Sequence, residues 1–443
     1  MDSRTSIVQI IVLGVFIFLG ILGVVVFAGF GSAGKNSAQD VTINLWGVLP
    51  KDSFTAVIES FNLNNPGYFK INYTEKSLST IESDLNEAII DKNPPDALLI
   101  PENILFRNQK KLSLISWSAL PEREFLDTFA ESGEVFKTSE GTYGIPFLID
   151  PIVMYWNRDV FSSASKALPP KTWDDVIGLI PVLSKISEDK KISRSMIPLG
   201  EFQNVSHSKE IIFALAHQAG SKMLVRDKEQ LSNQLLSSIY NDAAFSQDNP
   251  FEIVLNFFTQ FSDPTKPAYS WNRSLENSGI YFSKGSSATY LGFASELPGL
   301  RAKNPNLNFD VAEIPQSKNA DLAGGRKATF AHVYSLVIVG DSPYKQASYN
   351  EFMKLTSPEV SERFAQKFSV APSRRDLLAR GSNRASEATV WNSALFAKSF
   401  LDPDPFVVSS YLKDMVESII TGKVSSEEAT QIFSREIDEL IRK

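Results

Sequence analysis

The most constraining feature of the sequence is an early, regular alternation of two hydrophobic periodicities. VTINLWG (41–47) and FKINYTEK (69–76) alternate apolar and polar residues with a period of two, which predicts two strands. The apolar residues of 54–61 and 81–89 recur at helical spacing, which predicts a helix after each strand. DALLIP (96–101) is a third, short and apolar strand. Strands and helices that alternate through short connections predict a parallel sheet covered by helices.

The same alternation resumes after residue 170. Helical stripes lie around Trp173–Ile186, from Lys209 to Gly220 and after Phe251, and a strand is predicted at Ala288–Gly292. A length of 443 residues exceeds one ordinary hydrophobic core, so two or three domains are expected. The predicted fold class is therefore α/β with more than one core.

Two long apolar runs, Ile145–Trp156 and Ala328–Gly340, interrupt this alternation. Each run follows one α/β unit and leads into another, so we interpret both as connections that cross between two lobes. Two crossings build each lobe from discontinuous segments and leave a crevice between the lobes, where ligands of open α/β sheets bind. The side chains of the two runs that are expected to line or floor this crevice are Asp150, Tyr155, His332 and Tyr334.

The composition excludes several classes of protein. Apolar residues at 43% and charged residues at 21% are typical of a folded globular chain. A net charge of -7 without a Lys/Arg cluster argues against a nucleic-acid surface. The absence of cysteine excludes disulfides, thiolate metal sites, cysteine nucleophiles and a lipid-modified cysteine anchor. Only three histidines are left for a transition-metal site, so no metal and no cofactor are expected.

The N-terminal segment predicts where the protein is located. Residues 7–30 are apolar apart from Gln9 and four glycines, and at about 1.5 Å per residue they can cross roughly 30 Å of hydrocarbon. We expect them to form a single uncleaved transmembrane anchor after a short cytoplasmic end (1–6); a cleaved secretory signal is the alternative. GSAGKNSAQD (31–40) is typical of a flexible tether. In both cases the rest of the chain is expected on the extracytoplasmic side of the cell membrane.

Six stretches occur in an order and spacing that are informative together, although no single one is specific. They are VTINLWG, PPDALLIP, YGIPFLIDPIVMYWNRDVF, LPPKTWDDV, FSKGSSATYLGFASELPGLRAKNPNLNFDVAEIPQ and YSLVIVGDSPYKQASYNEFMKLTSPEVSERFAQKF. Through them the chain resembles, over about residues 41–440, the extracellular solute-binding proteins of ATP-binding-cassette importers, in the sugar and maltose-type branch (family 1). The resemblance implies a two-lobed, periplasmic-binding-protein-like fold that closes on its ligand by hinge bending, without catalysis.

The resemblance also implies a division of the chain and a set of partners. Lobe I is expected to comprise residues 41–147 and 328–372, and lobe II residues 148–327 and 373–443. The expected partners are a small polar solute (a mono- or oligosaccharide), the transmembrane permease subunits of an importer, and the membrane through the N-terminal helix. The sequence leaves open which solute and which permease are bound, and the oligomeric state.

Each candidate ligand contact has a structural alternative. Trp46 ends the first strand, where the family often places ligand contacts, or it packs in the core. Asp150 accepts hydrogen bonds either from ligand hydroxyls or from backbone amides at the hinge, because an unpaired buried carboxylate is costly. Tyr155 either packs or contacts the ligand. Trp271 lies in a polar loop where no apolar stripe demands a large ring, so we expect it to stack on a sugar face; covering a helix end is the alternative.

The segment Tyr290–Ser295 joins a predicted strand to a helix. Ser295 is a plausible N-cap, and the amides at the helix start could bind ligand oxygens; an ordinary cap is the alternative. Sugar-binding relatives commonly carry a Gly-Gly-Trp-like stretch at the second crossing, whereas this chain has Gly324-Gly325 early and then Phe330–Tyr334. His332 could replace the aromatic floor or pack beneath it. The full set of expected ligand-binding residues is Trp46, Glu75, Asp150, Tyr155, Trp271, Gly292, Phe293, Ser295, His332 and Tyr334.

Two other functions were weighed against solute capture. An anchored glycan-acting hydrolase would need a convergent catalytic set, and the chain shows no GxSxG, no HExxH and no paired nucleophile and base. A solute-sensing ectodomain that signals to a membrane partner stays open, because a sequence does not show the partner. We expect a membrane-anchored, extracellular solute-binding protein with no catalytic residues.

Overall fold

The computed structural model describes residues 41–221, 224–226, 235–237, 249–318, 320 and 325–442. The chain divides into two units, Met1–Thr42 and Ile43–Lys443, and all the described elements lie in the second. The expected cytoplasmic end, anchor and tether (1–6, 7–30 and 31–40) lie outside the described residues, as does Gly324. Among the helices that the structure does describe, none combines the length and the apolar character needed to span a bilayer.

The predicted strand–helix alternation at the start of the fold is confirmed. It consists of β1 (Ile43–Gly47), α2 (Lys51–Asn64), β2 (Ile71–Glu75), α3 (Ile81–Ile90) and β3 (Ala97–Pro101). β1 lies between β2 and β3 and pairs with both in parallel. The apolar stripes of α2 and α3 are buried, as the helical spacing requires.

Ten of the described strands form one sheet, whose main path has the order β12-β7-β14-β3-β1-β2. The two apolar runs of the sequence are its two longest strands, β7 (Gly144–Asn157) and β14 (Thr329–Val339). They pair with each other antiparallel. The strands that complete the sheet are β4 (Leu112–Ser113), β12 (Thr289–Phe293), β13 (Phe309–Ala312), β15 (Ala371–Pro372) and β16 (Ala397–Lys398).

β7 joins two parts of the sheet, which explains why all of its side chains are buried. Its first half pairs with β14 and β15, and its second half, from Ile152 onward, pairs with β12 and β13. β14 likewise pairs with β16 at its start and with β3 farther along. A strand that is covered on both faces needs a nearly continuous apolar sequence, as both runs have. The predicted lobe boundaries at 147/148, 327/328 and 372/373 stay predictions.

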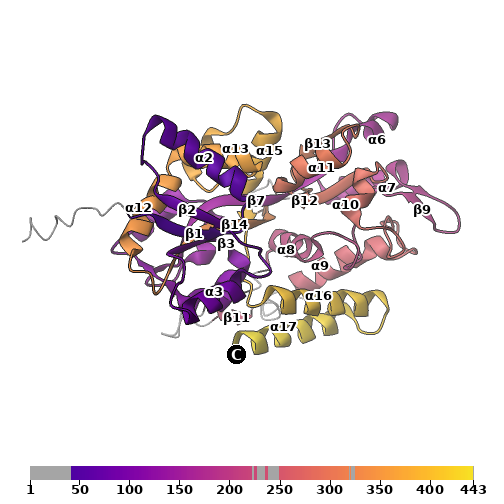
Figure 1. Cartoon of the computed structure of the whole chain (residues 1–443). Coiled ribbons are helices and arrows are strands. Elements are labelled where there is room, and N and C mark those ends of the chain that lie inside the picture. Colours follow the sequence, from indigo (N-terminus) through magenta and orange to yellow (C-terminus); the bar gives the residue numbers. More distant parts are fainter. Residues whose placement is uncertain are drawn as a thin grey trace, which may run out of the picture. The chain divides into compact units, whose positions relative to one another are not determined.

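Helices from distant parts of the chain pack around a second hydrophobic core. They are α7 (Trp173–Leu183), α8 (Ser208–Ala219), α9 (Pro250–Thr259), α16 (Pro405–Ile420) and α17 (Ser426–Arg442). In Figure 1, α16 and α17 (yellow) lie beside α9, and all three contribute to a cluster that runs in sequence from Ile152 to Ile437. This cluster is the second core that the length of the chain predicts.

The other elements are short connections or cover the first part of the sheet. α12 (Lys345–Leu355) and α13 (Pro358–Phe368) follow β14, and α13 packs against α2 (Figure 1). The remaining helices are α4 (Leu105–Asn108), α5 (Glu122–Thr128), α6 (Arg158–Ser163), α10 (Ser278–Ser283), α11 (Leu297–Lys303), α14 (Arg375–Arg380) and α15 (Ala385–Leu395). The small sheets pair β5 (Ile115–Ser116) with β6 (Gly141–Thr142), β8 (Lys185–Ile186) with β9 (Ile192–Arg194), and β10 (Leu224–Arg226) with β11 (Leu235–Ser237).

Candidate functional site

Polar and aromatic side chains collect where the parallel strands β1, β2 and β3 end. Because parallel strands place their carboxyl ends at one edge, Trp46, Glu75 and Glu102 share that edge. Trp46 is partly exposed, and the Lys76 ammonium lies 4.1 Å from its ring centroid. Glu75 is exposed, and its Oε2 accepts a hydrogen bond of 2.7 Å from the backbone N–H of Lys51, the first residue of α2. Trp46 and Glu75 are therefore both accessible at this edge, at the ends of two adjacent strands.

The pairing of β7 with β14 brings together the polar residues of the two apolar runs. Asp150 lies opposite His332, and Leu148 lies opposite Tyr334. Directly opposed residues of an antiparallel pair point to the same face, and residues two apart on a strand share a face. Asp150, His332 and Tyr334 therefore project from one face of the sheet, as the sequence predicts.

Asp150 is a nearly buried carboxylate with only part of its hydrogen-bonding capacity used. It is 2% exposed, and its Oδ1 accepts a hydrogen bond of 3.0 Å from the backbone N–H of Ser295. Burial raises the pKa of Asp150 from 3.8 to about 6, against the opposing effect of the Ser295 hydrogen bonds. Of the two interpretations of Asp150, the structure shows the hydrogen bond from a backbone amide, at Oδ1.

Ser295 does not cap a helix, and this corrects the sequence interpretation. It lies inside the 3-10 turn η6 (Ala294–Glu296), and Glu296 is the residue at the N-cap position of α11. The side chain of Ser295 is exposed. The turn instead directs the Ser295 amide toward Asp150, which links β7 to the end of β12.

His332 is held from behind by Glu102. Glu102 Oε1 lies 2.9 Å from His332 Nδ1, and Glu102 Oε2 accepts a hydrogen bond of 2.7 Å from the backbone N–H of Val333. The Glu102 side chain has no exposed surface, whereas 17% of the His332 side chain is exposed. Burial opposes protonation of His332, but the Glu102 carboxylate outweighs it, so the pKa of His332 is raised. His332 is thus an oriented group with one nitrogen fixed.

A second histidine–carboxylate pair, His207 and Glu296, lies near the first one, and the Phe293 ring contacts both histidines. The Phe293 ring stacks on His332 at 4.7 Å between centroids, and His207 meets it edge-on at 4.8 Å. His207 Nε2 lies 2.7 Å from Glu296 Oε1, and Glu296 Oε2 accepts from the Tyr290 hydroxyl at 2.8 Å. Burial raises the pKa of Glu296, but the hydrogen bonds from His207 and Tyr290 outweigh it, and the net direction is down.

Three residues of this arrangement, Glu102, His207 and Glu296, are not among those that the sequence predicted. His207 has a left-handed backbone (φ 60°) immediately before α8, a strained conformation that is uncommon for a residue other than glycine. Backbone strain leaves no mark on a sequence, so His207 offers no signal of its own. Glu102 did offer one, because it directly follows the apolar strand β3, in the same way that Trp46 ends β1.

Tyr155 and Gly292 support the turn and do not face a ligand. Tyr155 has no exposed surface, and its hydroxyl donates to the backbone carbonyls of Phe293 (2.7 Å) and Ala294 (3.2 Å). A Cβ at Gly292 would lie 2.5 Å from the Tyr290 ring and 2.8 Å from Glu296 Oε1. The structure therefore favours the packing alternative for Tyr155. At position 292 it favours glycine, because a larger side chain would clash with Glu296.

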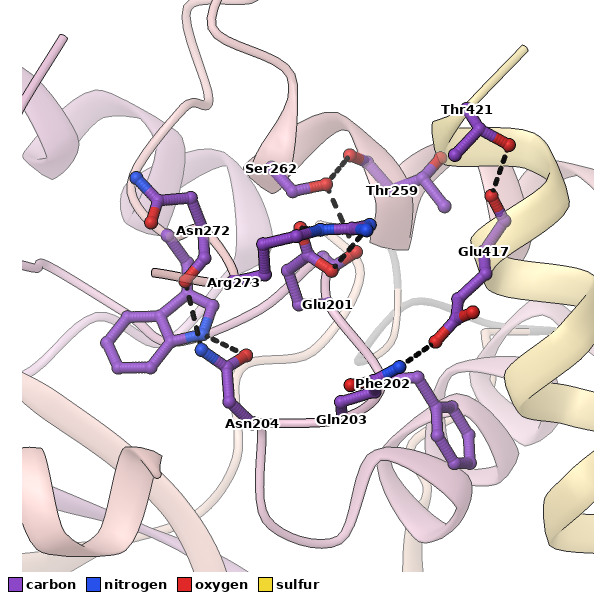
Figure 2. A network of polar contacts seen from close by, with 12 residues as sticks. Glu201, Phe202, Gln203, Asn204, Thr259, Ser262, Asn272, Arg273, Glu417 and Thr421 are labelled. Atoms are coloured by element: carbon purple, nitrogen blue, oxygen red, sulfur yellow. Dashed lines mark hydrogen bonds and ion pairs between the residues drawn. The ribbon is translucent and has the colours of Figure 1, made fainter. Parts of the chain in front are cut away.

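Trp271 is a core residue, which contradicts the expectation that its ring stacks on a sugar. None of its surface is exposed, it belongs to the second hydrophobic cluster, and it packs edge-on against Tyr281 at 5.2 Å. Its Nε1 donates to Asn204 Oδ1 at 3.0 Å, and the amide of Asn204 bonds back to the Asn272 carbonyl. Figure 2 shows Asn204 and Asn272 on facing loops that close over this core. Trp271 itself and its hydrogen-bond partner Asn204 lie in loops, outside any periodic helix or strand, so no apolar stripe signalled the buried position.

The candidate site contains both hydrogen-bond donors and hydrogen-bond acceptors, together with aromatic rings. Within the described part of the chain, His332 Nε2, the Tyr334 hydroxyl and Trp46 Nε1 have no intramolecular hydrogen-bond partner, and the only hydrogen bonds to the Asp150 carboxylate come from Ser295. The same part of the chain contains no group of three or more His, Cys, Asp or Glu side chains that could hold a metal ion. The arrangement is suited to binding a polar organic molecule through acceptors, donors and rings.

Comparisons with known proteins agree with this arrangement. A family profile described as bacterial extracellular solute-binding protein matches residues 56–398. A search of curated proteins finds no match.

Solved structures of similar fold are numerous, although their sequences differ widely. A cyclo/maltodextrin-binding protein complexed with maltotetraose has a TM-score of 0.71 at 14% identity, covering 92% of this chain and 99% of that one. The cyclic alpha-maltosyl-1,6-maltose binding protein from Arthrobacter globiformis has a TM-score of 0.71 at 15% identity, covering 91% and 99%. The sugar-binding protein MalE from Xanthomonas citri has a TM-score of 0.69 at 19% identity, and the match covers 91% of this chain and 98% of that one. These similarities show a two-lobed α/β, periplasmic-binding-protein-like fold.

Proposed function

The chain belongs to the bacterial extracellular solute-binding proteins, which are receptors and not enzymes, and we propose that it captures a small sugar between its two lobes. In this proposal the solute is a mono- or oligosaccharide. The protein is held at the outer side of the cell membrane by residues 7–30 and delivers the sugar to the permease of an ATP-binding-cassette importer.

The observation that carries the proposal is the set of unpaired polar atoms on one face of β7 and β14. Sugars need acceptors for hydroxyl hydrogens, donors for hydroxyl oxygens, and flat apolar surfaces for their C–H faces. Asp150 Oδ2 supplies an acceptor, His332 Nε2 and the Tyr334 hydroxyl supply polar partners, and Trp46 supplies a partly exposed ring. The fold neighbours bind maltotetraose, alpha-D-tagatose and mannotriose in their own structures, which supports a sugar as the ligand class.

The proposed ligand contacts differ from those that the sequence predicted. Trp46, Glu75, Asp150, Phe293, Ser295, His332 and Tyr334 remain proposed contacts, and Glu102, His207 and Glu296 join them as supporting groups. Tyr155 and Gly292 are kept as supports of the turn η6, and Trp271 is not proposed.

Binding of a sugar panel tests this function directly. We expect at least one of maltotetraose, tagatose and mannotriose to raise the melting temperature of the protein and to bind in calorimetry. Asp150→Asn should weaken that binding by about tenfold, since a charge-assisted hydrogen bond becomes a neutral one. Asp174→Asn, at an exposed position in the first turn of α7, is the matched control and should bind like wild type. Binding of charged peptides but of no sugar would contradict the proposal.

The proposed anchor has its own test. A chain that begins at Ala38 lacks residues 7–30, and all the described elements begin at Ile43 or later. We expect it to be released from membranes, to unfold cooperatively and to bind sugar as the full chain does. Aggregation of the shortened chain, when the full chain is well behaved in detergent, would contradict the anchor and tether assignment.

A further inference from the structure

The Glu102–His332 pair stands beside Asp150 in a geometry that fixes what each group can offer. Both oxygens of Glu102 are occupied, one by His332 Nδ1 and one by the Val333 amide. Nδ1 must therefore carry a hydrogen, and Nε2 is the nitrogen left for a ligand. Asp150, directly opposite on β7, has Oδ1 occupied by the Ser295 amide, and the exposed Ser295 side chain is the other hydrogen-bond partner of its carboxylate, so Oδ2 is the oxygen that the amide does not engage. One acceptor and one imidazole nitrogen thus stand side by side on one face.

We propose that Asp150 and His332 bind two adjacent hydroxyl groups of the solute, with His332 in its charged form and Glu102 as the positioning residue that keeps it charged. One hydroxyl donates to Asp150 Oδ2, and its neighbour accepts from the Nε2–H of His332. The inference rests on the proposed function and narrows its ligand class to solutes that present a vicinal diol. A protonated His332 beside an ionised Asp150 also makes this part of the site unfavourable for a solute with a net charge of either sign.

The groups packed around His332 support its charged form. Glu102 contributes a fully buried carboxylate at 2.9 Å, and the Phe293 ring lies parallel to the imidazole at 4.7 Å, where its face attracts a cation. On α8, Glu210 favours the charge and Lys209 opposes it. The Lys209 ammonium is itself neutralised by Asp402 at 2.9 Å and Glu210 at 3.7 Å. The Phe330 ring meets His332 edge-on at 5.4 Å and adds no charge.

The groups around Asp150 determine the lower end of the pH range in which the proposed pair can form, because Asp150 must be ionised. Ser295 and His332 favour its ionised form, whereas burial and Glu296 disfavour it, and the pKa rises to about 6. The proposed pair needs Asp150 ionised and His332 protonated at the same time. Affinity should therefore be highest between the apparent pKa values of the two groups and should fall by up to about tenfold per pH unit outside them.

Nuclear magnetic resonance of the imidazole nitrogens tests the positioning role without a ligand. The chain has only three histidines, His207, His217 and His332, so each signal can be assigned from single His→Asn variants. The full chain is studied in a detergent without a sugar headgroup. In wild type, His332 should titrate at a higher pH than an unperturbed histidine, near 6.5. Glu102→Gln, which keeps the shape of the side chain, should lower the His332 midpoint by at least about one pH unit.

His207 and His217 are internal controls in the same spectra. Their signals should be the same in wild type and Glu102→Gln, because neither histidine has a hydrogen bond to Glu102; burial lowers the pKa of His217 to about 4, so His217 should stay neutral throughout. A His332 that titrates at or below the midpoint of an unperturbed histidine in wild type, or does not respond to Glu102→Gln, overturns the positioning role.

Calorimetry with maltotetraose from about pH 5 to 9 tests the hydroxyl pair, over the range where both groups titrate. Wild type should show a bell-shaped affinity, and Glu102→Gln should lose about tenfold at pH 8 but much less at pH 5.5, where His332 is protonated without help. Glu210→Gln, which removes a more distant carboxylate, should keep the bell shape. A maltotetraose derivative in which the ring hydroxyls are methylated, and therefore cannot donate to Asp150 Oδ2, should not bind.

The outcomes separate this inference from the proposed function. If maltotetraose binds wild type and Glu102→Gln equally at every pH, the hydroxyl pair is wrong while the sugar-binding function stands. If neither maltotetraose nor mannotriose nor tagatose binds wild type at any pH, the sugar proposal fails and the hydroxyl pair fails with it. In that case the nitrogen spectra alone decide whether Glu102 holds His332 charged.

Discussion

At the scale of single residues, Asp150 shows how a binding site trades stability for function. Its carboxyl group is 2% exposed, and its pKa is about 6, above the ordinary value of 3.8. Between these two values the folded state binds more protons than the unfolded state, so stability falls as the pH rises from about 4 to about 6 and then levels off. Ionised Asp150 therefore costs roughly 2 to 3 kcal/mol of folding free energy at neutral pH.

The first prediction is that Asp150→Asn stabilises the protein above pH 6. The amide is neutral, and its oxygen can still accept the Ser295 N–H, so the cost of burying a charge disappears. Urea unfolding should show the variant more stable than wild type by about 1 to 3 kcal/mol at pH 7 and nearly equal to it at pH 4. An equal difference at both pH values would show that Asp150 is not held with a raised pKa.

The second prediction concerns the two tryptophans whose roles the sequence did not separate. Trp271→Ala removes a fully buried ring and its bond to Asn204, so it should lower the free energy of unfolding by about 3 to 5 kcal/mol. Trp46→Ala is the matched control at a partly exposed position and should cost less than about 1 kcal/mol. Equal stability of wild type and Trp271→Ala would contradict the core assignment.

At this scale the sequence predicts positions on strands but not partners across the fold. Asp150, His332 and Tyr334 were predicted together because all three lie on the two apolar runs that were interpreted as connections between the lobes. Glu102 and Glu296 were missed because their roles come from His332 and His207, which are far from them in sequence. Trp271 was misassigned because its surroundings come from loops, whose packing follows no period.

At the scale of elements, the turn η6 is the part of the site that depends most on close packing. It follows β12 directly, and Tyr155 holds two of its carbonyls from β7. The Phe293 amide donates to Glu296 Oε1 at 2.9 Å, which closes the turn on itself. The sequence predicted the strand and the helix that flank this turn but took the turn for an ordinary helix start, because a 3-10 turn and an N-cap share the same residue types.

The third prediction is that Gly292→Ala disturbs this turn. The new Cβ would come within 2.5 Å of the Tyr290 ring and 2.8 Å of Glu296 Oε1, so the variant should lose about 1 to 3 kcal/mol of stability and bind sugar more weakly. Gly299→Ala, in α11, is the control: nothing lies within 4 Å of its Cβ, and alanine favours a helix by up to about 1 kcal/mol. Both variants are measured by urea unfolding and calorimetry, and a Gly292→Ala protein as stable as wild type would contradict the packing argument.

At the scale of the whole molecule, the two apolar runs decide the architecture. A strand buried on both faces must be apolar throughout, and two such runs separated by more than one α/β unit predict a pair of crossings. In the structure the two runs are the long strands β7 and β14, which pair with each other; that they cross between the lobes stays a prediction. The strand order and the segments that build the second core were beyond the sequence, because they depend on contacts between elements such as α9 and α17, which no local pattern relates.

The fourth prediction is that sugar binding closes the lobes through bending at these two strands, near Ile149–Asp150 and Ala328–His332. Pro151 has no N–H and therefore cannot donate to the ladder opposite Ala331, which leaves the crossing with fewer hydrogen bonds at that point. A ligand shifts the equilibrium only by its preference for the closed state, so the effect must saturate with sugar concentration. Small-angle scattering should show a smaller radius of gyration at saturating maltotetraose. At the lower concentration that half-closes wild type, an Asp150→Asn protein that binds about tenfold more weakly should show only a small part of the wild-type compaction. If calorimetry shows full occupancy while the scattering profiles of free and bound protein are identical, the crossings are rigid connections and the hinge assignment is wrong.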